Sequence, residues 1–87
     1  MPDTLESVRR KLRFRSLRRG TKESDMVIGG FANDHLQDLD RRQLEHFEAL
    51  LDENDQDVLS WVMEMMLPPA AFDTDVLDML RTYKKKI

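Results

Sequence analysis

The sequence has 87 residues, of which 40% are hydrophobic and 36% are charged, as is typical of one small globular domain with a heavily charged surface. It contains no cysteine, so disulfides, thiolate catalysis and cysteine-ligated zinc are excluded. No apolar run approaches the roughly 18 residues that a membrane-spanning helix needs, so we expect no stable membrane insertion. From its length, we interpret residues 1–87 as a single helical domain.

Charge is divided unevenly along the chain. Residues 1–22 carry a net charge of +6, whereas the remainder carries −9. This asymmetry favours binding to an acidic protein surface, to nucleic acid phosphates or to an anionic membrane surface, although a solvated helix face without a partner also fits. The acidic remainder would be repelled by nucleic acid. We therefore favour a protein partner and keep a basic nucleic-acid-binding helix as the alternative.

The first predicted helix runs from about Asp3 to Arg18. Its apolar side chains recur at helical spacing, at Leu5, Val8 and Leu12. Asp3 and Glu6 can form a capping box. We expect Gly20 to end the helix, because glycine enters the left-handed conformation without steric cost.

The second predicted helix runs from about Lys22 to Leu36 and contains Gly29 and Gly30 in its middle. Each glycine costs roughly 1 kcal/mol in a helix interior relative to alanine. The helix therefore either breaks at these glycines or uses them for close packing against a neighbour. We favour a single helix.

Three further helices are expected. One begins at Asp40, which can form a capping box with Gln43, and the last begins at Asp73 or Thr74. Between them, a helix from Asn54 or Asp55 is expected to continue to Pro68, with Met66 facing the core. The alternative is that Met63, Met65 and Met66, with Trp61, form an adaptable binding surface. Short connections between amphipathic helices predict an all-α fold, a small antiparallel helix bundle of about five helices.

The sequence offers no catalytic or metal-binding pattern. His35 and His46 are the only histidines and lie on different predicted helices. Two such residues are too few ligands for a metal site. The acidic stretch 52–57 lacks the glycine and the downstream glutamate of a calcium loop. Gly29 and Gly30 lack the spacing of a phosphate-binding loop. We expect no catalytic residues, no metal and no stably bound cofactor.

The connection between the first two helices reads Arg19-Gly20-Thr21-Lys22-Glu23. Taken alone, it needs no function, because Gly20 can stop one helix while Thr21 caps the next. Further along, Phe47-Glu-Ala-Leu50-Leu51 precedes the acidic stretch, which is followed by Val58-Leu59-Ser60-Trp61. In order, spacing and length, over residues 8 to 83, the chain resembles the SdhE family, whose hallmark is Arg-Gly-x-x-Glu.

The resemblance implies a bundle of about five helices and a role as an assembly chaperone. Such a factor binds the flavoprotein subunit of succinate dehydrogenase, or of the related fumarate reductase, and promotes its covalent FAD attachment. FAD and the chemistry then belong to the partner, and this chain is not an enzyme. The expected partner-binding residues are Arg15, Arg18, Arg19, Gly20, Lys22, Glu23 and Asp25.

Location is the least constrained expectation. The N-terminal segment is rich in arginine, as organelle transit peptides are, but Asp3 and Glu6 are unusual in such segments. We interpret it as part of the fold. A bacterial cytoplasmic protein is therefore expected.

Overall fold

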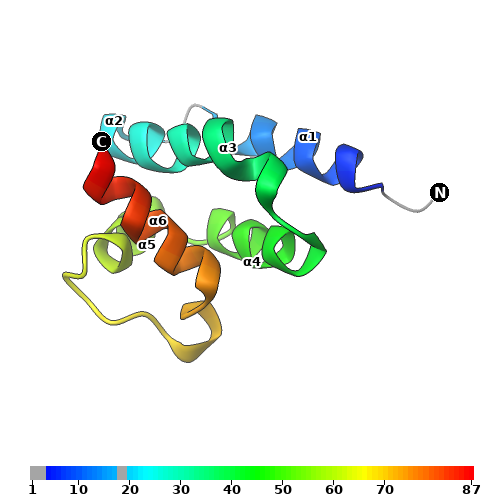
Figure 1. Cartoon of the computed structure of the whole chain (residues 1–87). Helices are drawn as coiled ribbons and strands as arrows, with labels where there is room; N and C mark the ends of the chain where they lie inside the picture. Colours follow the sequence, from blue (N-terminus) through cyan, green and yellow to red (C-terminus); the bar gives the residue numbers. More distant parts are fainter. Residues whose placement is uncertain (1–3, 18–19) are drawn as a thin grey trace.

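The computed structural model of the chain describes residues 4–17 and 20–87, and every regular element in these residues is helical (Figure 1). The predicted all-α bundle is confirmed. In chain order the elements are α1 (Leu5–Ser16), α2 (Lys22–Ser24), the π-helical η1 (Asp25–Gly29), α3 (Gly30–His35), the 3-10 turn η2 (Leu36–Asp38), α4 (Arg41–Leu51), α5 (Asp55–Val62), the 3-10 turn η3 (Ala70–Phe72) and α6 (Asp75–Lys86). Because α2, η1 and α3 follow one another without a break, they count as one helix and give the predicted number of about five.

The helices form two layers (Figure 1). Helix α1 runs antiparallel to the continuous helix of α2, η1 and α3, and α4, α5 and α6 lie across the other side. The core between the layers is apolar, and its largest fully buried side chains include Leu12, Phe31, Phe47, Leu77 and Leu80. The amphipathic faces read from the sequence therefore meet in one hydrophobic core.

The two glycines of the second helix permit close packing. A Cβ atom on Gly29 would lie 3.1 Å from the carbonyl oxygen of Ser16, and one on Gly30 would lie 2.6 Å from the hydroxyl oxygen of Tyr83. The helix therefore stays continuous, with a π-helical segment just before Gly30, and the glycines admit α1 on one side and α6 on the other. The preference for one helix is confirmed.

The predicted end of the first helix is wrong. Helix α1 ends at Ser16, and Leu17 is already extended. The Ser16 hydroxyl donates to the carbonyl oxygen of Arg13, and the Leu17 N–H donates to that of Phe14, so local bonds satisfy the last turn. Gly20 lies beyond the helix, and no described glycine has a positive φ. At the other end Thr4 is the N-cap; Asp3 lies outside the described residues.

The predicted extension of the fourth helix to Pro68 is also wrong, because α5 ends at Val62. The N–H of Glu64 donates to the Trp61 carbonyl and that of Met65 to the Ser60 carbonyl, which is the bonding of a Schellman motif. Glu64 takes the left-handed position, with φ of 61°, that glycine usually fills. The chain then leaves the helix, so Met66 is 61% exposed and does not face the core.

Candidate protein-docking site

The connection from Gly20 to Glu23 is a structured turn. Thr21 is the N-cap of α2: its hydroxyl oxygen accepts the Ser24 N–H at 3.1 Å, and the Ser24 hydroxyl accepts the Thr21 N–H at 3.2 Å. The predicted cap at Thr21 is therefore confirmed. Arg18 and Arg19 lie outside the described residues, so their expected role remains a prediction.

Asp55 holds this turn from the start of α5. Its Oδ2 atom accepts the Gly20 N–H at 3.0 Å and the hydroxyl of the fully buried Ser24 at 3.3 Å. The sequence interpretation did not single out Asp55 for this role. Its only signal was membership of the acidic stretch 52–57, where helix capping seemed a sufficient explanation. The bonds instead join the turn to a segment thirty-five residues away.

Glu23, Lys22 and Asp25 all lie on the surface. Lys22 is the first residue of α2, at the positive end of the helix dipole, where a cation is unfavourable. Helix stability therefore does not explain Lys22. Glu23 has no hydrogen bond or ion pair with any residue in the described ranges, so its carboxylate is available to a partner.

Gly20 is not required by the chain's own packing. Its φ is not positive, and an added Cβ would be in ordinary van der Waals contact, 3.6 Å from Asp55 Oδ2. The missing side chain does leave an exposed stretch of backbone that another molecule can approach closely. This contrasts with Gly29 and Gly30, whose space is filled by the chain itself.

Three of the five basic side chains of α1 contact other parts of the molecule. Arg15 pairs with Glu48 at 3.6 Å and with Asp52, and Lys11 pairs with Glu48 at 3.2 Å. Arg9 donates to a backbone carbonyl of the loop before α4 at 2.9 Å. These cations hold α1 against α4. Fewer remain for phosphates than the sequence suggested, which weakens the nucleic-acid alternative.

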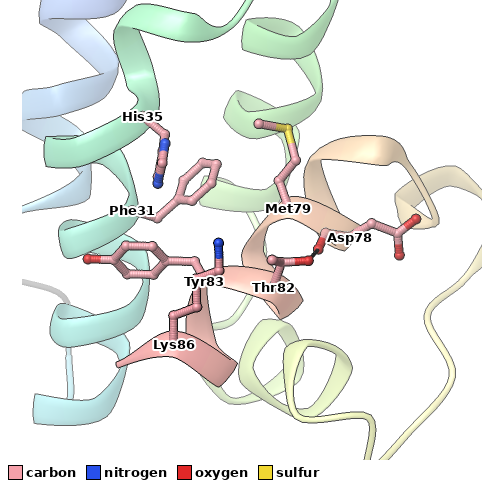
Figure 2. A pocket seen from close by; sticks show the side chains of 7 residues that line it. All are labelled: Phe31, His35, Asp78, Met79, Thr82, Tyr83 and Lys86. Atoms are coloured by element: carbon pink, nitrogen blue, oxygen red, sulfur yellow. Dashed lines mark hydrogen bonds between the residues drawn. The ribbon is translucent and has the colours of Figure 1, made fainter.

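A separate hollow of about 280 Å³ lies between α3 and α6 (Figure 2). Its aromatic side chains are Phe31, His35 and Tyr83, with ring centroids 5.4 to 5.9 Å apart. The Tyr83 hydroxyl donates to Asp34 at 3.0 Å, and burial, followed by this bond, raises the pKa of Tyr83 above its ordinary value of 10.0. These contacts pack α6 against α3. The Tyr83 hydroxyl stays protonated because its pKa is raised.

Within the described ranges, no group of three or more His, Asp or Glu side chains could hold a metal ion. None of the described helices is both long and apolar enough to cross a bilayer. The candidate site is therefore the exposed turn itself, with the Gly20 backbone, the Glu23 carboxylate and the neighbouring charges.

Comparisons with known proteins identify the family of the chain. A family profile described as "flavinator of succinate dehydrogenase" matches residues 10–84. The chain belongs to this family. The predicted resemblance is therefore confirmed over nearly the whole of the helical bundle.

The chain is also similar to proteins named as succinate dehydrogenase assembly factors. The chain is 32% identical over 81 residues to succinate dehydrogenase assembly factor 2 of Dictyostelium discoideum, covering 93% of this chain and 57% of the relative. It is 33% identical to the protein of the same name from Cryptococcus neoformans, covering 92% of this chain and 46% of that relative. It is 35% identical to the one from Meyerozyma guilliermondii, covering 91% of this chain and 62% of that relative. The chain thus spans about half the length of these relatives. Their names agree with the predicted assembly role.

The expected bacterial cytoplasmic location is wrong. The relatives are named as mitochondrial proteins and come from eukaryotes. The expectation rested on a missing transit peptide, and a missing leader is uninformative in a chain that spans about half of each relative.

The second sequence signature of the family lies in the core. Phe47, Leu50 and Leu51 of α4 are buried, and Trp61 of α5 is 6% exposed. Trp61 stacks on Phe72 with ring centroids 5.2 Å apart. These residues belong to the hydrophobic core, whereas the turn from Gly20 to Glu23 is exposed.

Proposed function

We propose that this chain binds the flavoprotein subunit of succinate dehydrogenase through the turn from Gly20 to Glu23 and promotes covalent attachment of FAD to that subunit. The observation that carries the proposal is the exposed turn, hydrogen-bonded to Asp55, in a member of the flavinator family. The same surface would serve a fumarate reductase flavoprotein.

Each residue of the turn has a chemistry suited to docking. The Gly20 backbone admits close approach of another chain, and the Glu23 carboxylate accepts bonds from an arginine or from backbone N–H groups. Lys22 and Asp25 flank Glu23 with charges of both signs, which gives the surface a preferred orientation toward its partner. Arg15, whose cation is shared with two carboxylates of α4, would add a weaker contact at the edge.

FAD would remain with the partner. The backbone at Gly29 and Gly30 is covered by Ser16 and by Tyr83, so these glycines cannot receive a pyrophosphate. The hollow between α3 and α6 lacks a phosphate-binding loop. Within residues 4–17 and 20–87, these features therefore do not fit a resident dinucleotide, and we derive no chemical step within the chain.

The chain would act by shifting a conformational equilibrium of its partner. A ligand that binds one conformation more tightly raises its population by the difference in binding free energy. A tenfold change of population requires about 1.4 kcal/mol of differential binding. A few hydrogen bonds from the turn suffice for this, and no catalytic group is needed.

The test is a reconstitution from purified apo-flavoprotein subunit, FAD and this chain. Covalent flavin is read as the fluorescence of the denatured subunit. We expect Glu23→Ala and Gly20→Arg to lower the rate by about tenfold or more, as the loss of a central interface contact does, without loss of helicity.

Glu45→Ala is the matched control, because Glu45 is also an exposed helical glutamate but lies on α4. It should leave the rate unchanged. Equal rates of covalent attachment with and without the wild-type chain would refute the proposed function.

A further inference from the structure

Most of the exposed large apolar side chains line two depressions beside α6, one of which also includes Glu23. Seven large hydrophobic residues are exposed in the described ranges, and five of them line these depressions. Together with the half-buried Met63, they form what we call the methionine strip: Met26, Met63, Met65, Met66, Leu67 and Ile87. The other two, Phe14 and Leu17, belong to the α1 side.

The strip lines two depressions. One, of about 270 Å³, is lined by Met26, Met63 and Ile87, and also by Glu23. The other, of about 360 Å³, is lined by residues 64–67 and by Arg81. The chain passes from one to the other at residues 63 and 64, and each depression includes a residue of α6, Lys84 in the first and Arg81 in the second. Glu23 therefore borders the part of the strip that contains Met26 and Met63.

The backbone holds the strip open to solvent. The left-handed conformation at Glu64 turns the chain out of α5, and two prolines follow Leu67, which is 92% exposed. Small monomers rarely expose so many adjoining large apolar groups unless they bind something. Methionine, being flexible and polarizable, suits a surface that adapts to a partner.

Charge at the border indicates what the strip receives. Lys84 lines the first depression, as Glu23 does, and no carboxylate in the described ranges pairs with it. Arg81, in contrast, is held by Asp78 at 2.8 Å and by the Trp61 carbonyl at 3.1 Å. A partner segment that is apolar and carries a carboxylate would bury the methionines and satisfy Lys84.

We propose that the methionine strip is a second docking surface, which receives an apolar segment of the flavoprotein subunit with a carboxylate facing Lys84. This inference rests on the proposed function, since it extends the contact made by Glu23. The turn would orient the partner, while the strip would supply the buried apolar area that holds it.

The test measures the dissociation constant of the full chain with the apo-flavoprotein subunit, together with the rate of covalent FAD attachment. Met26→Asp places a charge in the strip at a side chain that is 53% exposed, so folding should tolerate it. We expect affinity to fall about tenfold or more, as at a buried interface position. Phe14→Asp, an exposed apolar residue outside the strip, should change it less than twofold.

Lys84→Glu and Lys85→Glu form a matched pair, because the two lysines are adjacent in the last turn of α6 and only Lys84 lines the depression. Lys84→Glu should weaken binding several-fold more than Lys85→Glu, and more at low salt than at high salt. Equal effects of the two changes would contradict the predicted carboxylate contact.

Full affinity and rate with Met26→Asp, when the wild type binds and stimulates, would overturn this inference and leave the proposed function intact. A selective loss with Phe14→Asp would place the partner on the α1 side instead. A wild-type dimer in sedimentation that Met26→Asp dissociates would identify a second copy of the chain as the occupant and also overturn it. No stimulation by the wild type would refute the proposed function itself.

Discussion

The two sequence signatures on which the resemblance was based occupy opposite environments in the molecule. In the signature from Phe47 to Trp61, the large apolar side chains of α4 and α5 lie in the core, and Trp61 stacks on Phe72 of η3. The turn from Gly20 to Glu23 contributes nothing large to the core, and its glycine is free of packing constraints. A substitution of a core residue in the signature from Phe47 to Trp61 should therefore lower the stability of the fold, and one in the turn should weaken binding of the partner.

The largest expected effect comes from Phe47→Ala. Phe47 is fully buried, and its ring centroid lies 5.7 Å from that of Phe31. Removing a buried phenylalanine side chain costs about 3–5 kcal/mol, which is a large fraction of the stability of so small a domain. Circular dichroism should show a much lower melting temperature, with covalent FAD attachment lost in parallel. Unchanged melting would show that this signature is not structural.

A pair of glycine substitutions gives an intermediate effect and compares the regions directly. Gly30→Val would push a side chain against Tyr83 and break its bond to Asp34, so we expect a loss of about 2 kcal/mol from overpacking. Gly20→Val meets no such obstacle and should change stability by less than about 0.5 kcal/mol. Urea denaturation measures both. Similar losses would mean that Gly20 also serves the fold.

A pair of aspartate substitutions in α5 tests the connection between the regions, with a smaller loss of stability than Phe47→Ala or Gly30→Val. Asp55→Ala removes the acceptor of the Gly20 N–H and the Ser24 hydroxyl, which should cost about 1–2 kcal/mol. The looser turn should also weaken binding of the flavoprotein. Asp57→Ala is the control, since Asp57 lies in the same first turn of α5 but is exposed. Equal loss of binding for both variants would contradict a specific role for Asp55.

The sequence predicted the buried signature better than the exposed turn, and the reason is physical. Apolar spacing at positions such as Leu44, Phe47 and Leu51 reports burial directly, and the caps at Thr21 and Asp40 are local patterns. The bond from Gly20 to Asp55 depends on tertiary packing, so no local rule could reveal it. The predicted left-handed stop at Gly20 failed because the Ser16 and Leu17 bonds complete the helix end without a glycine.

The same difference explains the error at the end of α5. Met63, Met65 and Met66 continue a helical apolar pattern, and a glycine that would signal the end is missing. Glutamate takes the left-handed position instead, which sequence preference does not anticipate. The apolar residues beyond it are consequently on the surface, where the family resemblance alone gave no reason to look for a contact.

The tie between Gly20 and Asp55 has a practical consequence for inhibitor and scaffold design. A synthetic peptide that copies the turn would lack the carboxylate that orders it, and would lose conformational entropy on binding that the folded chain has already lost. A transplant onto another helical hairpin would need an acidic side chain placed to receive both the Gly20 N–H and the Ser24 hydroxyl. The smallest fragment that keeps the structure of the turn must therefore combine two separate segments of the sequence, the turn itself and the segment that carries Asp55.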